Sequence, residues 1–358
     1  MLSEECYARI GLMGNPSDGF GGKTLSFLIR NFSAIVTLCP HSADSLEKNA
    51  ICFSPHKTLD PFVFEDIHAF HHYSNVNGYY GGLRLLQATV QSFMKRICAA
   101  QKQSALSSKV GFTLAYDTTI PRCVGLSGSS AIIVATFNIL LKYYDLTIAD
   151  LNISQSQYPD VILNIEKEEL HIAAGLQDRV IQTYGGCVHM DFTNNLNGNG
   201  NIYTPVAVRL LPNMYLVYNI HVGGDSGKVH STVKERWLNR DPGLITGMAT
   251  LGQYADEAKN ALENGDAGAL AVLMQKNFAM RRELYGDDVV GEKNIAVIME
   301  LERFGLAGKF TGSGGAIVCQ RLNNEMNWFQ EDKEKEISEV ILDKYGFAFC
   351  RVHIPESA

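Results

Sequence analysis

The chain has 358 residues, with 31 Lys and Arg against 38 Asp and Glu, which gives a formal net charge of −7. Because a domain usually holds about 100–200 residues, this length favours two domains. The acidic balance argues against nucleic acid as the main partner, since binding to phosphates along a strand needs a basic surface. The eight cysteines are scattered without a CxxC pair, which argues against a disulfide scaffold or a zinc ribbon.

The chain also lacks sequence signals for export or for a membrane. Its first twelve residues do not have the basic and then apolar pattern of a signal peptide. The most apolar run, residues 131–141, is shorter than the roughly 20 residues that cross a bilayer. We therefore expect a cytoplasmic protein with no membrane partner, and no pattern in the sequence predicts an oligomeric state.

The predicted elements change from strands to helices along the chain. Alternating and β-branched apolar patterns predict strands at residues 7–13, 25–38, 110–116 and 215–221. Apolar residues at helical spacing predict helices at residues 83–101, 129–144, 161–174, 249–264, 267–285 and 293–304. This order predicts an α+β fold and disfavours a doubly wound parallel sheet.

A polar segment at residues 191–201 is rich in Asn and Gly, which favour turns. It predicts a junction near residue 205, and therefore two domains at residues 1–205 and 206–358. The alternative is an ordinary hairpin loop within one domain.

Glycine is concentrated in a few short windows. Of the 32 glycines, 21 fall in residues 11–22, 78–82, 125–128, 175–186, 223–227 and 305–315. Because glycine permits a positive φ and lets the backbone approach a ligand closely, we expect the chemistry of this protein near these windows.

The window at residues 125–128 leads directly into an apolar helical stretch. Ser129 and Ser130 stand where helix N-cap hydroxyls would lie. Free backbone N–H groups and the positive end of a helix dipole favour phosphate at such a point, and a serine hydroxyl there can reach a phosphate-bound Mg²⁺. The alternative is a well-capped core helix after a turn.

The first window contains Gly22-Lys-Thr but does not fit a Walker A loop. That motif needs a glycine where Ser17 stands and must open a helix, whereas residues 25–38 have a strand pattern. We interpret the window as a tight turn after a strand that presents Arg9 and Asp18 to a small polar substrate. A plain turn is the alternative.

The window at residues 175–186 follows an acidic helical stretch. Glu166 and Glu169 are three residues apart, so both would project from one helical face and either could bind a metal ion. Asp178 lies between two glycine-rich breaks, which is unusual for a purely structural acid. A solvated helix face is the alternative for the acidic stretch. The window at residues 305–315 predicts either a loop that faces a ligand or a hairpin into a core strand.

Taken together, these windows resemble the motifs of the GHMP kinases, which phosphorylate small molecules. The middle motif of that family is P-x-x-x-G-L-[GS]-S-S-[AGS], and residues 121–130 follow it except that Gly128 replaces the usual first serine. The resemblance implies that ATP phosphates are bound by the loop residues Gly125, Leu126, Ser127, Gly128, Ser129, Ser130 and Ala131. It leaves open whether Ser129 or Ser130 binds Mg²⁺.

The same resemblance assigns the remaining motif residues. Asp178 matches the catalytic aspartate, and Arg9 matches a basic residue that assists catalysis. Asp18 and Gly14 lie in the motif that binds substrate. The metal-binding glutamate of the family precedes the aspartate by eleven or twelve positions, which favours Glu166 and keeps Glu169 as the alternative. Residues 309–315 match the third, glycine-rich motif.

Within the family, the details look most like the plant-type glucuronokinase branch, including the stretch at residues 224–231. That likeness implies an ATP- and Mg²⁺-dependent kinase that converts D-glucuronate to its 1-phosphate and feeds UDP-glucuronate synthesis. Galacturonate, fucose, a heptose phosphate or a mevalonate-like acid are alternative acceptors, and a non-catalytic sensor is a further alternative. Arg122, Arg179 and Lys228 are candidates for binding the substrate carboxylate.

The family resemblance also implies a fold. It predicts an N-terminal domain like the second domain of ribosomal protein S5 and a C-terminal ferredoxin-like domain.

Overall fold

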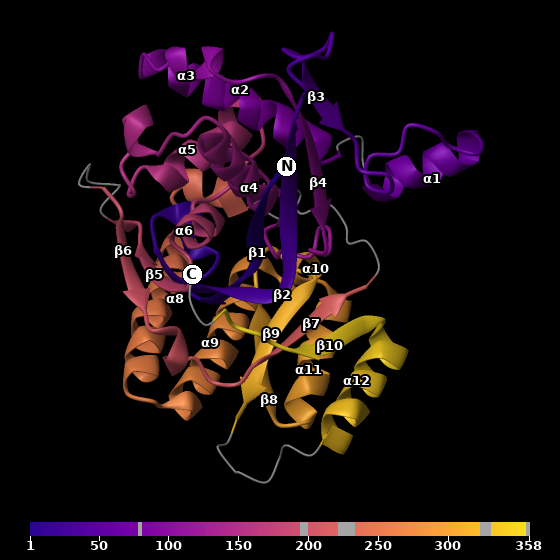
Figure 1. Ribbon diagram of the computed structural model, residues 1–358. Coiled ribbons are helices and arrows are strands. Elements are labelled where there is room, and N and C mark those ends of the chain that lie inside the picture. The colour runs from indigo at the N-terminus through magenta and orange to yellow at the C-terminus, as the bar shows by residue number, and fades with distance from the viewer. Residues whose placement is uncertain (78–80, 194–199, 221–232, 323–330, 356–358) are drawn as a thin grey trace. The chain divides into compact units, whose positions relative to one another are not determined.

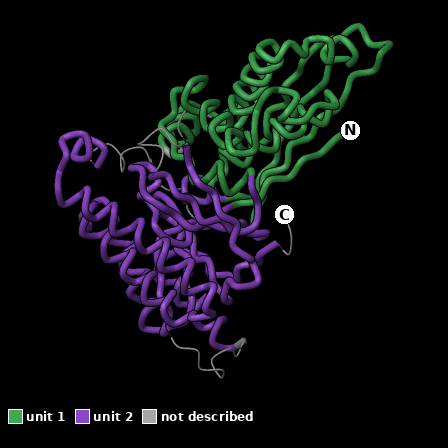
Figure 2. The backbone as a smooth tube through the Cα atoms, turned by 90° about the vertical axis from the view of Figure 1, so that its left-hand side faces the viewer, with its two compact units in different colours: residues 1–8, 32–120, 127–183 green, residues 9–31, 121–126, 184–358 purple. Residues whose placement is uncertain are grey.

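The computed structural model describes residues 1–77, 81–193, 200–220, 233–322 and 331–355 (Figure 1). They form two compact units that alternate along the chain (Figure 2). Unit 1 contains residues 1–8, 32–120 and 127–183, and unit 2 contains residues 9–31, 121–126 and 184–358. Two long strands, β1 (Leu2–Met13) and β2 (Lys23–Pro40), each contribute residues to both units.

Unit 1 combines a small sheet with apolar helices. Residues 34–40 of β2 pair antiparallel with β4 (Phe112–Thr118), and β3 (Ile51–Ser54) pairs parallel with β4. The almost wholly buried helix α4 (Gly128–Tyr143) contacts α2 (Leu83–Ala99), whose apolar residues lie on one face. The shorter helices of unit 1 are α1 (Ile67–Asn77), α3 (Ser104–Ser107), α5 (Tyr158–Asn164) and α6 (Gln177–Tyr184), which ends at the unit boundary.

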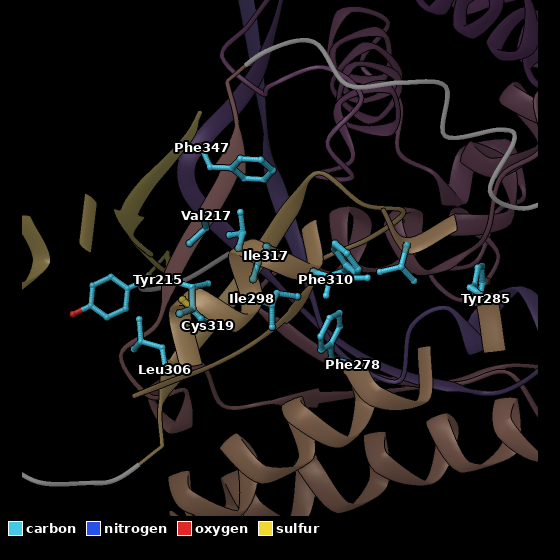
Figure 3. Close-up of a cluster of buried hydrophobic side chains, with 14 of the residues drawn as sticks. Tyr215, Val217, Phe278, Tyr285, Ile298, Leu306, Phe310, Ile317, Cys319 and Phe347 are labelled. Carbon is cyan, nitrogen blue, oxygen red and sulfur yellow. The ribbon is translucent and has the colours of Figure 1, made fainter. Parts of the chain in front are cut away.

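Unit 2 contains a four-stranded antiparallel sheet in the order β10-β7-β9-β8. Its strands are β7 (Tyr215–Asn219), β8 (Leu306–Phe310), β9 (Ala316–Arg321) and β10 (Phe347–Arg351). Its helices are α8 (Pro242–Glu263), α9 (Ala267–Tyr285), α10 (Asp287–Val290), α11 (Glu292–Arg303) and α12 (Glu331–Tyr345). Side chains from this sheet and from the helices form a buried apolar cluster that includes Tyr215, Phe278, Phe310 and Phe347 (Figure 3).

The long helix pair of unit 2 has well-defined starts. The Asp241 side chain accepts the backbone N–H of Leu244 at 3.1 Å and caps α8. The Asp266 side chain accepts the N–H of Ala269 at 2.8 Å and caps α9, which ends before Gly286 with its φ of 78°. Helix α9 contacts both α8 and β8, so its direction and register are fixed by packing on two sides.

The α+β fold predicted from the sequence is confirmed, and most of the predicted elements lie within a few residues of the observed ones. The helix predicted at residues 161–174 is wrong beyond Glu169. Helix α5 continues as a π-helical turn (Ile165–Glu169) and ends at Glu169. After this turn, the N–H of Ile172 donates a hydrogen bond to the carbonyl of Glu166 at 2.9 Å. His171 has a positive φ of 55°, which turns the chain out of the helix.

The Asn-rich segment joins two paired strands. Residues 187–191 of β5 (Cys187–Asp191) pair antiparallel with β6 (Ile202–Val206), and residues 23–27 of β2 pair with β5 in the same unit. These pairings agree with the hairpin interpretation. Residues 194–199 of the segment lie outside the described part of the chain. The division into two domains near residue 205 stays a prediction. All eight cysteines are described, and each is a free thiol. Among the described residues, no helix is both long enough and apolar enough to cross a membrane.

Candidate active site

The predicted phosphate loop passes from one unit to the other. Gly125 and Leu126 belong to unit 2, whereas residues 127–131 belong to unit 1. Ser127 has φ 67° and ψ 42°, a left-handed conformation that costs a non-glycine residue about 1–3 kcal/mol, and α4 begins at the next residue. The side chain of Ser127, the N-cap residue, makes no capping hydrogen bond within the described part of the chain, which leaves the first backbone N–H groups of α4 suited to an anion.

Ser129 and Ser130 have different environments. Ser129 is exposed, and its Oγ donates a hydrogen bond to Oε1 of Glu166 at 2.9 Å. Ser130 is fully buried, and its Oγ donates to the backbone carbonyl of Ser127 at 3.2 Å. Neither serine occupies the N-cap position predicted from the sequence, because α4 begins one residue earlier than expected and Ser127 stands there. Of the two hydroxyls, only that of Ser129 faces both a carboxylate and solvent.

Glu166 lies in the π-helical turn after α5 and is 2% exposed. Its Oε1 accepts from Ser129, and its Oε2 forms an ion pair with Nη2 of Arg179. Arg179 is also buried and donates through Nη1 to the carbonyl of Gly175 at 3.0 Å. The sequence had made Arg179 a candidate for the substrate carboxylate, but the structure directs its guanidinium to protein carboxylates.

Glu169 has a different partner. Lys95 of α2 places its Nζ 2.6 Å from Oε1 of Glu169. The sequence argument placed Glu166 and Glu169 on one face of an α-helix, but in a π-helical turn residues three apart do not stack. The structure therefore brings Glu166, and not Glu169, to the hydroxyl of Ser129.

Asp178 lies in the first turn of α6, where the helix dipole favours a carboxylate. Its side chain is 21% exposed, and its Oδ2 lies 3.5 Å from Nη1 of Arg179. One turn later on α6, Nε2 of Gln182 donates to the carbonyls of Tyr7 and Ser127, both at 3.1 Å. Gln182 thus ties α6, the helix that carries Asp178, to the phosphate loop at Ser127 and to β1 at Tyr7. Tyr7 lies two residues before Arg9.

The unit 2 part of the predicted site is built on backbone carbonyls. Arg9 is 5% exposed, and its Nη1 donates to the carbonyls of Gly125 at 2.6 Å and Thr311 at 3.0 Å. The carbonyl of Gly125 also accepts from Oγ1 of Thr311 at 3.1 Å. Gly125 has φ +76°, and a Cβ there would lie 2.9 Å from the backbone nitrogen of Ser313. The loop therefore packs closely on the third glycine-rich window at Gly125, where a side chain could not be added without strain.

The predicted substrate residues follow β1. Gly14 has φ +85°, and its N–H donates to Oδ1 of Asn277 at 2.9 Å. Asp18 lies in the 3₁₀ turn Ser17–Phe20 and is partly buried, so the turn presents a carboxylate that could accept hydrogen bonds from hydroxyl groups.

Asn277 and Arg281, which lie beside these loops, were not predicted from the sequence, whereas Lys309 and Thr311 fall in the predicted third window, which had assigned them no individual role. Lys309 is 1% exposed, and its Nζ donates to Gly11 O at 2.8 Å and to Oδ1 of Asn15 at 2.6 Å. Burial and the nearby guanidinium groups hold the pKa of Lys309 well below its usual value. The sequence of residues 267–285 did not single out Asn277 and Arg281, because a polar residue in a helical pattern normally indicates a solvated position.

Two other sequence candidates add little to this geometry. Arg122 lies in the loop of unit 2 and is partly buried. Lys228 and the stretch at residues 224–231 lie outside the described residues.

The oxygen donors around Glu166 fit a divalent metal of the Mg²⁺ type. Mg²⁺ prefers one or two carboxylates from the protein and takes its other oxygen ligands from water and substrate phosphates. Glu166 supplies one carboxylate and Ser129 one hydroxyl, 2.9 Å apart at their oxygens. Within the described part of the chain, no group of three or more His, Cys, Asp or Glu side chains could form an all-protein metal site. The pair suits a metal that arrives with a phosphate ligand.

Comparisons with known proteins agree with the motif assignment. The family model "GHMP kinases N terminal domain" matches residues 88–186. Glucuronokinase 1 of Arabidopsis thaliana is 41% identical over 346 residues, which cover 93% of this chain and 89% of that protein. The chain belongs to the GHMP kinase family. Probable glucuronokinase 2 of the same plant is 42% identical over 346 residues, which cover 94% of this chain and 89% of that protein.

Solved structures show that the whole chain has the GHMP kinase fold. Methanococcus jannaschii mevalonate kinase superposes with a TM-score of 0.69 at 16% identity, covering 99% of this chain and 98% of that one. Lactococcus lactis galactokinase, complexed with galactose, superposes with a TM-score of 0.67 at 15% identity, covering 99% and 95%. As a GHMP kinase, the protein is a small-molecule kinase, and kinases of this family use ATP with a divalent metal. The family and fold predicted from the sequence are confirmed.

Proposed function

We propose that this GHMP kinase is a glucuronokinase that converts D-glucuronate and ATP to D-glucuronate 1-phosphate and ADP. The observation that carries the proposal is its identity of 41% and 42% with two Arabidopsis glucuronokinases, over more than nine-tenths of the chain. The exposed hydroxyl of Ser129 beside buried Glu166, and the partly exposed carboxylate of Asp178, support the same reaction class.

We assign the proton transfer to Asp178. A bond forms between the anomeric oxygen of the sugar and the γ-phosphorus of ATP, and the bond from that phosphorus to the oxygen of the leaving ADP breaks. Asp178 accepts the proton of the anomeric hydroxyl, which is more acidic than an ordinary alcohol, so that an aspartate suffices as the base. The guanidinium of Arg9 is assigned to stabilise negative charge on the reacting phosphate.

We assign nucleotide binding to the loop at residues 125–131. Backbone N–H groups at the start of α4 would hold ATP phosphates, because the N-cap residue Ser127 does not cap them with its own side chain among the described residues. When bound, Mg²⁺ neutralises charge on the phosphate oxygens. Ser129 and Glu166 are the proposed protein ligands, since Ser130 is buried against Ser127 and Glu169 is paired with Lys95. Asp18 and the turn at Gly14 are assigned to the sugar.

A substrate panel tests the proposal. ADP release would be measured with D-glucuronate, D-galacturonate, L-fucose, a heptose phosphate and mevalonate, each over a range of concentrations. We expect kcat/KM for D-glucuronate to exceed that for a neutral sugar by about a hundredfold or more, since loss of a carboxylate leaves its polar partners unpaired. A neutral sugar with the higher kcat/KM would contradict the substrate, and nucleotide binding without ADP release for any acceptor would contradict the enzyme. An Asp178→Asn sample prepared in parallel identifies ADP release by contaminating kinases.

A further inference from the structure

Helix α9 carries three buried polar residues at a spacing of four. Asn277, Arg281 and Tyr285 are 1%, 3% and 7% exposed. Residues four apart lie along one face of an α-helix, so these three form a polar stripe on the buried side of α9. A buried helix face is normally apolar, because polar groups there lose their contacts with water unless the protein supplies hydrogen bonds.

The first member of the stripe holds the turn assigned to the sugar. Oδ1 of Asn277 accepts the N–H of Gly14 at 2.9 Å, and its Nδ2 donates to the carbonyl of Asn15 at 3.4 Å. A Cβ on Gly14 would lie 2.1 Å from the carbonyl oxygen of Lys23, so the turn has little freedom on its other side. The segment continues within three residues to Asp18, which the turn Ser17–Phe20 presents.

The second member holds the turn that supports the ATP loop. Nη1 of Arg281 donates to the carbonyl of Gly312 at 2.6 Å, and Nη2 donates to the carbonyl of Ser313 at 2.8 Å. Gly125 of the ATP loop packs directly on this turn, because a Cβ on it would lie 2.9 Å from Ser313 N. A change in the position of Arg281 would therefore reach Gly125 through the backbone.

Aromatic rings fix the guanidinium group of Arg281. Its Cζ lies 4.8 Å from the ring centroid of Phe310 and 5.3 Å from that of Tyr285. Among the described residues no carboxylate forms an ion pair with Arg281, and burial lowers its pKa. An apolar side chain would fill this space without the cost of burying a charge. The guanidinium of Arg281 instead donates two hydrogen bonds in one plane to consecutive carbonyls. These bonds define the position of the turn, which an apolar side chain could not do.

We propose that Asn277 and Arg281 are positioning residues, one for sugar binding and one for ATP binding, which α9 holds one helical turn apart. Their separation of four positions corresponds to about 6 Å along the helix axis, so the helix acts as a rigid spacer between the two turns. The assignment of the turns to sugar and ATP rests on the proposed function.

Steady-state kinetics of the full chain with D-glucuronate and ATP tests this proposal. Asn277→Leu keeps a side chain branched at Cγ with the same number of non-hydrogen atoms but removes both hydrogen bonds, and it should raise KM for the sugar about tenfold with KM for ATP within about twofold. Arg281→Met should show the opposite pattern, and Arg281→Lys, which keeps the charge and one donor, should lie between Arg281→Met and the unmodified chain.

Arg282→Met is the matched control. Arg282 follows Arg281 on α9 but pairs with Asp287 at the surface, where an ion pair contributes little, so both KM values should stay within about twofold. Unfolding midpoints of all variants would be measured in parallel. If Asn277→Leu and Arg281→Met raise both KM values by the same factor, or change the midpoint without changing either KM, the residues have only a structural role and the proposal is wrong.

Equilibrium binding of a fluorescent ATP analogue separates this proposal from the proposed function. The measurement needs no sugar, so it remains valid if the unmodified chain fails to phosphorylate D-glucuronate, a failure that would contradict the proposed function alone. Weaker nucleotide binding in Arg281→Met than in Asn277→Leu supports the positioning roles. Equal binding by the two variants overturns them.

Discussion

The proposed site residues of the two units are held in opposite electrostatic settings. In unit 1 the functional groups are carboxylates, and Glu166 and Asp178 share one buried cation, Arg179. In unit 2, apart from Asp18, the charged residues described around the loops are cations, and Arg281 and Lys309 donate to backbone carbonyls and an amide oxygen. A chain with a net charge of −7 can therefore serve anionic substrates, because its positive groups are placed by loop carbonyls rather than collected on a basic surface.

The contrast indicates how each group works. In unit 1 the two oxygens of Glu166 contact a hydroxyl and a guanidinium, which fixes the orientation of the carboxylate that we propose as a metal ligand. Cations held on carbonyls fix the path of the glycine-rich turns, as in unit 2, where burial and neighbouring cations lower the pKa of Lys309. We expect substitutions of the unit 1 carboxylates to act mainly on kcat, and those of Arg281 and of the glycine-rich turns mainly on KM. Arg9 of unit 2, which we assign to the reacting phosphate, should also act on kcat.

The strongest test of that division is Asp178→Asn. Loss of the proposed base should lower kcat by about 10²–10⁴-fold while ATP and sugar still bind, because the amide preserves the shape of the side chain but cannot accept the proton. Single-turnover kinetics and equilibrium binding would separate the two effects. Glu168→Gln, which changes an exposed acid near the same segment, is the control and should leave kcat within about twofold. An Asp178→Asn enzyme with full kcat would remove Asp178 from the mechanism.

A paired substitution tests the proposed metal ligands. Ser129→Ala should lower kcat about 10–100-fold and raise the Mg²⁺ concentration needed for half-maximal rate, because it removes an oxygen beside Glu166. Ser130→Ala should change that concentration little, since the buried Ser130 hydroxyl donates to the carbonyl of Ser127 and faces no carboxylate among the described residues. The measurement is rate against Mg²⁺ concentration at saturating ATP. Ser130→Ala with the larger effect would reverse the assignment.

Two glycines of the ATP loop offer a comparison on the KM side. Gly125→Ala places a Cβ 2.9 Å from Ser313 N at φ +76°, and we expect KM for ATP to rise about tenfold. At Gly128 a Cβ would meet nothing closer than 3.5 Å, and its φ is not positive, so Gly128→Ala should change KM by less than about twofold. Equal effects at the two glycines would contradict the contact between the ATP loop and the turn at residues 312–315.

The smallest expected effect concerns stability rather than turnover. Burial lowers the pKa of His189, whose Nε2 lies 2.9 Å from Asp256, with Lys259 and Lys23 also near. The folded protein therefore binds fewer protons there than the unfolded chain, and the free energy of unfolding should decrease as pH falls below 6.5, the usual pKa. His189→Gln should flatten this decrease, by at most about 1.4 kcal/mol per pH unit.

Urea titrations between about pH 7.5 and about pH 5 would measure the slope. His353→Gln, at an exposed histidine, is the control. An unchanged slope in His189→Gln would show that other groups set the pH dependence of stability.

The sequence predicted the fold and the local motifs because their signals are continuous along the chain. The spacing of Glu166 and Asp178 and the run from Gly125 to Ser130 were readable without a structure. The choice between Ser129 and Ser130 was not, because it depends on whether α4 begins at residue 128 or later. The separation of Glu166 from Glu169 depends on a π-helical turn that periodicity does not reveal.

The stripe on α9 could not be predicted for a different reason. Asn277 and Arg281 lie more than 250 residues after Gly14 in the chain, and their hydrogen bonds exist only because β8 and α9 pack in one unit. A polar residue in a helical pattern normally indicates a solvated position. Only the burial of both side chains indicates that they support the loops instead of facing water.

We propose that this chain phosphorylates the anomeric oxygen of D-glucuronate. Phosphorus and proton NMR of the product formed from D-glucuronate and ATP would test it most directly. We predict one new phosphate ester whose phosphorus couples to the anomeric proton of the sugar, formed in equal amount with ADP, and absent with Asp178→Asn. A product phosphorylated at any other hydroxyl, or no sugar phosphate at all, would contradict phosphorylation at the anomeric oxygen.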